Sequence, residues 1–215
     1  MKKTTFWAFL LSLVTLISCN SNEVHLRLAH YNVGVFHKTA ESSIDVIAAM
    51  MKEIEADVVS LNELDSCARR TGFVDQLAQM SVLMGDWGSH YVSAMPFQGG
   101  AYGVGITYDP SLNLVKKDKV ALPKLLGPEP RVLAVTEFED FVFATCHLDY
   151  VSEETQLGQV DVINEYFNTV YADCDKPIFL CGDFNARPDN PSICFMRENW
   201  NILTPEGATG VGGKN

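Results

Sequence analysis

The sequence lacks several features that would assign it at once to a common class of protein. Its 215 residues contain no internal repeat, no low-complexity linker and no Cys-x-x-Cys or Cys/His spacing of a zinc site. Basic residues are few, 16 against 27 acidic ones, and no run of them suits a broad nucleic-acid groove. With 47% hydrophobic and 20% charged residues, the composition excludes a wholly disordered, collagen-like or coiled-coil chain and fits one globular domain.

The cysteines exclude a complete disulfide framework. Six are present, and setting aside Cys19 leaves five, an odd number. Cys146 and Cys181 lie in apolar runs, where a free cysteine behaves as a small buried apolar residue.

The first 18 residues have the pattern of an export signal. Lys2 and Lys3 precede an apolar run at 6–17, which is shorter than the ~20 residues of a membrane-spanning helix. Residues 16–19, Leu-Ile-Ser-Cys, resemble the lipobox of bacterial lipoproteins, whose cysteine is lipidated. The alternative is an ordinary cleaved signal. We expect a signal peptide at 1–18, a lipid anchor on Cys19 with a tether at 19–25, and an envelope protein facing the periplasm or the outside.

The remainder, residues 26–215, alternates strand-like and helical patterns and is expected to form one α/β domain. Consecutive strands without an intervening helix at 90–146 favour antiparallel pairing, whereas the flanking strand–helix–strand passages favour layered packing. Predicted strands are 26–33, 57–61, 90–93, 103–108, 112–122, 131–137, 141–146 and 177–181, and predicted helices are 42–54, 73–84 and 153–171.

Polar side chains follow four of the apolar strands where each strand ends. These are Asn32, Glu63, His147, and Asp183 with Asn185. If the strand ends meet at one edge, these side chains converge, and their carboxylate and amide oxygens suit Mg²⁺ or Mn²⁺. Each also has an ordinary explanation: a turn for Asn32 and for 183–185, a solvated loop for Glu63, a structural histidine for His147.

The sequence resembles the endonuclease/exonuclease/phosphatase superfamily of metal-dependent phosphoesterases. The resemblance rests on five motifs in the family's order, at residues 28–33, 56–63, 102–106, 145–149 and 182–186. Gly-Asp-Phe-Asn at 182–185 and Thr-Cys-His-Leu at 145–148 are the most specific of them. The resemblance implies a four-layer α/β/β/α sandwich of two mixed β-sheets flanked by helices.

It also implies roles for individual residues in phosphoester hydrolysis. Glu63 would be the principal metal ligand, and Asn32 would hold the metal or a bound water. Asp183 would orient or deprotonate the attacking water, Asn185 would donate to the phosphoryl group, and His147 would donate to a non-bridging oxygen or assist the leaving group.

Arg131 is a candidate phosphate contact, although a salt bridge is an equal alternative. Candidate substrates are phospholipid head groups, small phosphate esters and nucleic acid, and the sequence indicates no protein partner. The acidic net charge of −11 favours phospholipid head groups and small phosphate esters over nucleic acid, although a bound metal can supply local positive charge.

Two departures from the family pattern stand out. Asn62 replaces the usual Gln beside the metal-binding glutamate, a change that we expect to be tolerated. The family's later Asp-Tyr-Ile strand and Ser-Asp-His element do not follow Asn185, so the domain is expected to be incomplete at its C-terminus, poorly soluble and weakly active. The alternative function is that of a non-catalytic envelope binding protein or an inactive, truncated family member.

Overall fold

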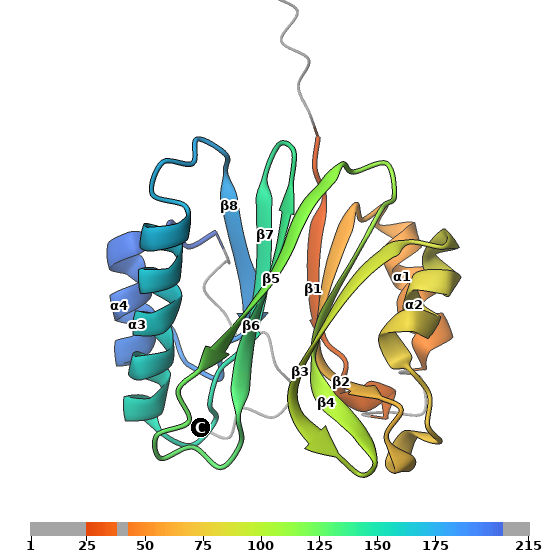
Figure 1. Cartoon of the computed structure of the whole chain (residues 1–215), viewed down its shortest axis with the longest axis horizontal. Helices are drawn as coiled ribbons and strands as arrows, with labels where there is room; N and C mark the ends of the chain where they lie inside the picture. The colour runs from red at the N-terminus through yellow and green to blue at the C-terminus, as the bar shows by residue number, and fades with distance from the viewer. Residues whose placement is uncertain (1–24, 38–42, 204–215) are drawn as a thin grey trace, which may run out of the picture.

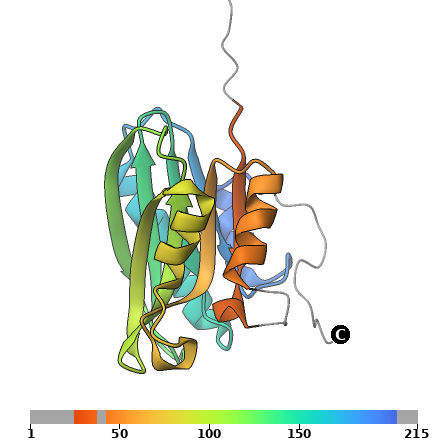
Figure 2. The ribbon, with the colours of Figure 1, turned by 90° about the vertical axis from the view of Figure 1, so that its right-hand side faces the viewer.

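The computed structural model describes residues 25–37 and 43–203, and their alternating apolar pattern folds into two sheets packed face to face. Helices α1 (Ile44–Glu53) and α2 (Gln76–Gly85) cover the outer face of one sheet, and α3 (Glu153–Val170) and α4 (Pro191–Asn199) cover the other (Figure 1). Figure 2 shows α1 and α2 side by side. The predicted α/β/β/α sandwich is confirmed.

Both sheets are mixed. The first has the strand order β1-β2-β4-β3 and the second β5-β6-β7-β8. The pairs β1–β2 and β7–β8 are parallel and all others antiparallel, so the antiparallel pairing predicted for 90–146 is confirmed. The strands are β1 (Leu28–Asn32), β2 (Val58–Ser66), β3 (Gly88–Phe97), β4 (Gly100–Tyr108), β5 (Leu114–Leu122), β6 (Arg131–Phe138), β7 (Val142–His147) and β8 (Ile178–Asp183).

Three apolar clusters hold the layers together. Successive residues of a strand point to opposite faces, so Val58 of β2 packs between the sheets while Val59 packs against the helices. Phe143 and Ala144 of β7 divide in the same way on the second sheet. Burial on both faces explains why these strands read as continuous apolar runs.

The helices begin at side chains that cap their first N–H groups. Ser43, Asp75 and Ser152 cap α1, α2 and α3. α4 was not predicted, although Asn190 and Pro191 form a recognisable helix start, with Asn190 as N-cap and Pro191 in the first turn. The 3₁₀ turns Gly34–Phe36 and Arg69–Thr71 were not predicted either.

Other expectations lie partly outside the described residues. The signal, the lipidation site Cys19 and most of the tether fall in 1–24, and the C-terminal tail falls in 204–215. The five cysteines of the described part are free thiols. Cys146 is buried as predicted, whereas Cys181, on the edge strand β8, is only partly buried. No helix in the described part combines the length and the apolar character needed to cross a membrane.

The edges of the two sheets differ in how they are protected. β5 carries Lys116, Lys117 and Lys119, and β3 carries Pro96 and a bulge, all of which discourage the addition of another strand. The opposite edges, β1 and β8, contain neither lysine nor proline and are partly exposed. β8 is the last strand of the described residues.

Gly182 allows β8 to approach β7. A Cβ atom at this position would lie 2.2 Å from the carbonyl oxygen of Cys146, and the residue has a φ of 155°. Because the obstacle is backbone, a side chain here cannot be accommodated by a rotamer change.

We therefore expect Gly182→Ala to lower the free energy of unfolding in urea by about 1–3 kcal/mol more than Gly85→Ala does. Gly85 is the matched control, because its φ of 114° is also positive but its Cβ would meet nothing within 4 Å. Equal losses for the two variants would contradict the close approach.

Candidate active site

The two parallel strand pairs bring the predicted residues to one end of the sandwich. Asn32 of β1 pairs with Asn62 of β2, and His147 of β7 pairs with Asp183 of β8. Both pairs end at the lower end of the molecule in Figure 1. The inference that separate strand ends converge there was made from the sequence, and the structure brings four of the five side chains together.

Glu63 reaches this end through a β-bulge. The register of β2 against β4 passes from Asn62↔Val104 to Leu64↔Gly103, which leaves Glu63 unpaired with a φ of 59°. A bulge re-aims the side chain of its extra residue. Glu63 therefore lies within a strand rather than in the loop that is the ordinary alternative.

Asn32 joins the carboxylates of the two sheets. Its Nδ2 donates to Glu63 Oε1 at 2.8 Å and to Asp183 Oδ2 at 2.8 Å. Its Oδ1 accepts from the Gly34 N–H at 3.1 Å, which fixes the orientation of the amide. In this arrangement Asn32 presents its nitrogen to the acidic pair.

The residues fit a divalent cation. Ligand atoms of Glu63, His147 and Asp183 lie within 4.8 Å of one another, and His147 Nε2 lies 4.0 Å from Asp183 Oδ2. Two carboxylates supply hard oxygen ligands, and a neutral amide between them cannot cancel their charge. A bound cation would do so.

Asp183 is held in its ionised form. Burial raises its pKa, but the hydrogen bond from Asn32, the nearby His147 imidazole and the Asn185 backbone N–H together bring the pKa below the ordinary aspartate value. The carboxylate is therefore ionised at neutral pH, as both a metal ligand and a water-orienting group require.

Asn62 is a residue whose importance the sequence did not indicate. It is fully buried, and its Oδ1 accepts the Asp183 backbone N–H at 2.8 Å. Its Nδ2 donates to Thr145 Oγ1 at 3.3 Å. A single side chain thus connects β2 to β7 and β8 across the two sheets. The available signal was a polar residue inside an apolar strand next to Glu63.

Arg131 contacts His147 on the side of the ring away from Asp183. Its side chain is 3% exposed, Nη1 is 3.1 Å from His147 Nδ1, and Nη2 is 3.2 Å from Glu129 Oε2. A guanidinium can only donate, so Nδ1 accepts and the proton of the neutral ring is on Nε2, the atom nearer Asp183. The expected contact between Arg131 and phosphate stays a prediction.

Asn185 lies beside the cluster with its amide turned away. Its backbone N–H donates to Asp183 Oδ1 at 3.0 Å, and its Nδ2 donates to the Leu148 carbonyl at 3.1 Å. The amide has two hydrogens, so this bond leaves its role as a phosphoryl donor open as a prediction. Asn185 also lines a cavity of about 450 Å³.

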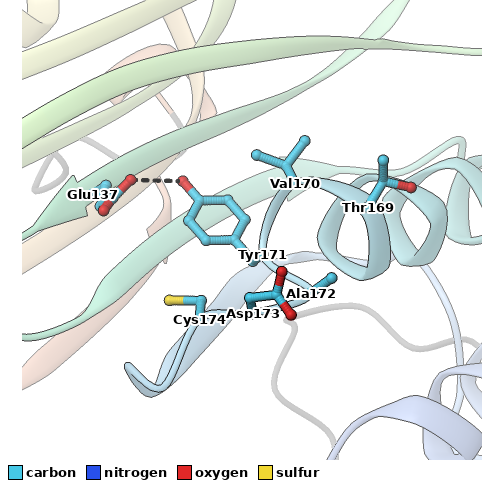
Figure 3. Close-up of a pocket in the computed structure, with 7 residues that line it drawn as sticks. All are labelled: Glu137, Thr169, Val170, Tyr171, Ala172, Asp173 and Cys174. Atoms are coloured by element: carbon cyan, nitrogen blue, oxygen red, sulfur yellow. Dashed lines mark hydrogen bonds between the residues drawn. The ribbon is translucent and has the colours of Figure 1, made fainter.

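A second cavity, of about 280 Å³, lies at the other end of α3 (Figure 3). Glu137, one of its two acidic lining residues, accepts hydrogen bonds from Tyr171 at 3.3 Å and from Lys176 at 2.8 Å. These partners satisfy the carboxylate, and none of the predicted site residues lines this cavity.

The protein-family comparison agrees with the geometry. The model described as Endonuclease/Exonuclease/phosphatase family matches residues 29–213. The chain belongs to this family. Its members are phosphoesterase hydrolases that generally depend on divalent metals, which accords with the neighbouring carboxylates of Glu63 and Asp183, which could hold an ion. No curated protein matched the sequence.

Solved structures share the fold at low sequence identity. A mannosyl-6-phosphatase of Bacteroides thetaiotaomicron is 18% identical with a TM-score of 0.62, over 79% of this chain and 68% of its own. A family protein from Bacteroides vulgatus is 14% identical with a TM-score of 0.63, over 80% of this chain and 69% of its own. The human Nocturnin catalytic domain is 14% identical with a TM-score of 0.62, over 81% of this chain and 70% of its own. A further B. thetaiotaomicron family protein is covered over only 65% of its length.

We expect Arg131→Met to change the tautomer of His147, because Nδ1 then loses the donor that makes it an acceptor. The measurement is the pair of ring ¹⁵N chemical shifts of His147, assigned with a His147→Gln spectrum. Arg131→Lys, which keeps a donor, should restore much of the wild-type pattern.

Arg70→Met is the control. Arg70, like Arg131, forms an ion pair with a carboxylate, in this case that of Asp65 at 2.7 Å, but it makes no bond to His147. Unchanged ¹⁵N shifts in Arg131→Met would show that Arg131 does not set the tautomer.

Proposed function

We propose that this chain hydrolyses phosphoesters with the help of a divalent metal ion held at Glu63, with Asn32 positioning the acidic pair. One observation carries the proposal: Glu63 and Asp183, from different sheets, meet at the same Asn32 nitrogen, 2.8 Å from each. Two carboxylates brought this close favour a cation.

The side chains divide the remaining tasks. Asp183, which is ionised, accepts a hydrogen bond from the attacking water and orients it toward phosphorus. His147 donates from Nε2–H to a non-bridging phosphoryl oxygen, with Arg131 holding its ring. Asn185 donates its second amide hydrogen to the phosphoryl group. The water oxygen forms the new bond to phosphorus and loses a proton to Asp183, the ester P–O bond breaks, and the departing alkoxide takes up a proton from solvent water to leave as the alcohol.

Mg²⁺ is the proposed ion, with Mn²⁺ as the alternative. Carboxylate ligands suit both, and Mg²⁺ in such sites keeps several waters and binds substrate phosphate. When bound, the ion supplies positive charge that neutralises the phosphoryl oxygens.

The proposed substrates are phosphate esters of small molecules or of lipid head groups. The acidic excess of the chain, 27 Asp and Glu against 16 Lys and Arg, disfavours a long polyanion such as nucleic acid. The B. thetaiotaomicron relative, named a mannosyl-6-phosphatase, supports a small phosphate ester.

We also propose that the protein is a lipoprotein of the bacterial cell envelope, anchored through Cys19 to the periplasmic or outward-facing side of a membrane. The support is the basic start, the apolar run at 6–17 and the Leu-Ile-Ser-Cys segment. The anchor would confine the enzyme to phosphoesters at or near that membrane.

We expect Glu63→Gln to lower kcat on bis-p-nitrophenyl phosphate by about a hundredfold or more, because the main charge holding the metal is removed. EDTA should abolish wild-type turnover, and Mg²⁺ or Mn²⁺ should restore it. Adding p-nitrophenyl phosphate to the assay separates diester from monoester cleavage.

The matched control is Glu165→Gln, an exposed glutamate on α3, which should keep the wild-type rate. Wild-type turnover that persists in EDTA, or in Glu63→Gln, would contradict the metal-dependent mechanism.

We expect Cys19→Ser to move the protein from the membrane fraction to the soluble fraction, because no thiol remains for lipid attachment. Labelling of cells with a radioactive fatty acid should mark the wild-type chain and not the variant. Cys67→Ser, at an exposed thiol of the domain, is the control. Membrane association that survives in Cys19→Ser would refute the anchor.

A further inference from the structure

The 450 Å³ cavity lies directly beside the proposed phosphate site. It lies between the loop after β7, the loop after β8 and the first turns of α3 and α4. Asn185 lines it, and the backbone N–H of Asn185 donates to Asp183 Oδ1 at 3.0 Å. A group attached to a phosphate that accepts hydrogen bonds from His147 and Asn185 would therefore extend into this cavity.

The cavity is not built as a second phosphate site, although two helices begin there. Helix starts bind anions through N–H groups that have no partner. Here Ser152 Oγ accepts from Thr155 N at 3.1 Å, and Asn190 Oδ1 accepts from Ser192 N at 2.9 Å. These caps occupy N–H groups that an anion would need.

The charges of the lining also disfavour ionic groups of either sign. Glu153 and Asp189 outnumber Arg187, so a second phosphate or a polyanionic chain would be repelled. A quaternary ammonium group would meet the Arg187 guanidinium. The lining therefore suits a neutral group rich in hydrogen-bond donors.

Gln156 adds a buried acceptor to the cavity wall. The residue is 3% exposed, and its Nε2 donates to the carbonyls of Asp149 at 2.6 Å and Asn185 at 3.0 Å, which fixes the amide. Its Oε1 has no hydrogen-bond partner among the described residues. A buried acceptor without a partner is unfavourable, and a hydroxyl donor would satisfy it.

Tyr150 supplies an aromatic face. It is 56% exposed, lines the cavity, and its ring lies 5.8 Å from the Arg131 guanidinium that supports His147. The flat apolar ring, with a polar tip, suits a ligand that has both C–H faces and hydroxyls.

We propose that this cavity binds the alcohol part of the substrate, a neutral polyhydroxylated group such as a sugar, a cyclitol or glycerol. The inference rests on the proposed function, since it assumes that a phosphate ester is bound beside His147 and Asn185. The carboxylates of Asp189 and Glu153 accept hydrogen bonds from the hydroxyl groups, and Tyr150 packs against the carbon framework.

The first test measures binding without metal or turnover. Saturation-transfer NMR in EDTA is recorded with a methyl hexopyranoside and, separately, with choline. We expect transfer to the hexoside with wild-type protein and its loss in Tyr150→Ala. Phe73→Ala, which removes another exposed aromatic away from the cavity, should keep the signal. No transfer, transfer to choline instead, or an unchanged signal in Tyr150→Ala would overturn the proposal.

The second test measures selectivity. A hexose 6-phosphate, an inositol phosphate and glycerol 3-phosphate are compared with phenyl phosphate, phosphocholine and a 5′-mononucleotide. We expect the wild-type protein to prefer the polyol esters. Asp189→Asn should lower kcat/KM for the best polyol ester, relative to phenyl phosphate, by about tenfold, the effect of one hydrogen bond to a charged group.

Asp173→Asn is the matched control, because Asp173 is an exposed aspartate at the other cavity. An unchanged ratio in Asp189→Asn, or a wild-type preference for phosphocholine or the nucleotide, would overturn the proposal. If the wild-type protein hydrolyses none of the esters, the proposed function fails, and the metal-free binding test decides the cavity by itself.

Discussion

Two carboxylates, one from each sheet, are held against a single amide, and the arrangement of this end of the molecule depends on that contact. Like charges at short range repel one another, most strongly where water is partly excluded. The Asn32 amide offsets part of this repulsion by donating to Glu63 and Asp183, each at 2.8 Å. A divalent cation would offset the remaining repulsion between the two carboxylates.

The two sheets must keep a fixed alignment for this contact to exist, and Asn62 provides it. Apolar packing between sheets is not directional and would tolerate small shifts. Asn62 restricts such shifts because it accepts a hydrogen bond from the Asp183 backbone N–H and donates one to Thr145 Oγ1. Asn62 is also the residue immediately before Glu63. Being fully buried, Asn62 could not lose these partners without the cost of an unsatisfied polar group.

Much of the fold was predictable because each strand left a continuous or alternating apolar pattern, and the site because its polar residues directly follow those patterns. This pattern singles out Asn32, Glu63, His147 and Asp183, and the structure brings their side chains together. The bulge at Glu63 was not predicted, since it depends on β4 across the sheet, and neither was the contact of Arg131 with His147, which depends on the pairing of β6 with β7. Asn62 looked like a tolerated replacement, because sequence alone does not show what a buried amide binds. α4 was missed since only its first turn carries a strong local signal.

The two sheet edges without lysine or proline end at residues of the candidate site. β1 ends at Asn32 and β8 ends at Asp183, whereas the edges bearing lysine, proline or a bulge belong to β5 and β3. Any additional strand that paired with β1 or β8 would hydrogen-bond to the same backbone that aims these two side chains. Pairing along this side would therefore also restrict the backbone positions of Asn32 and Asp183.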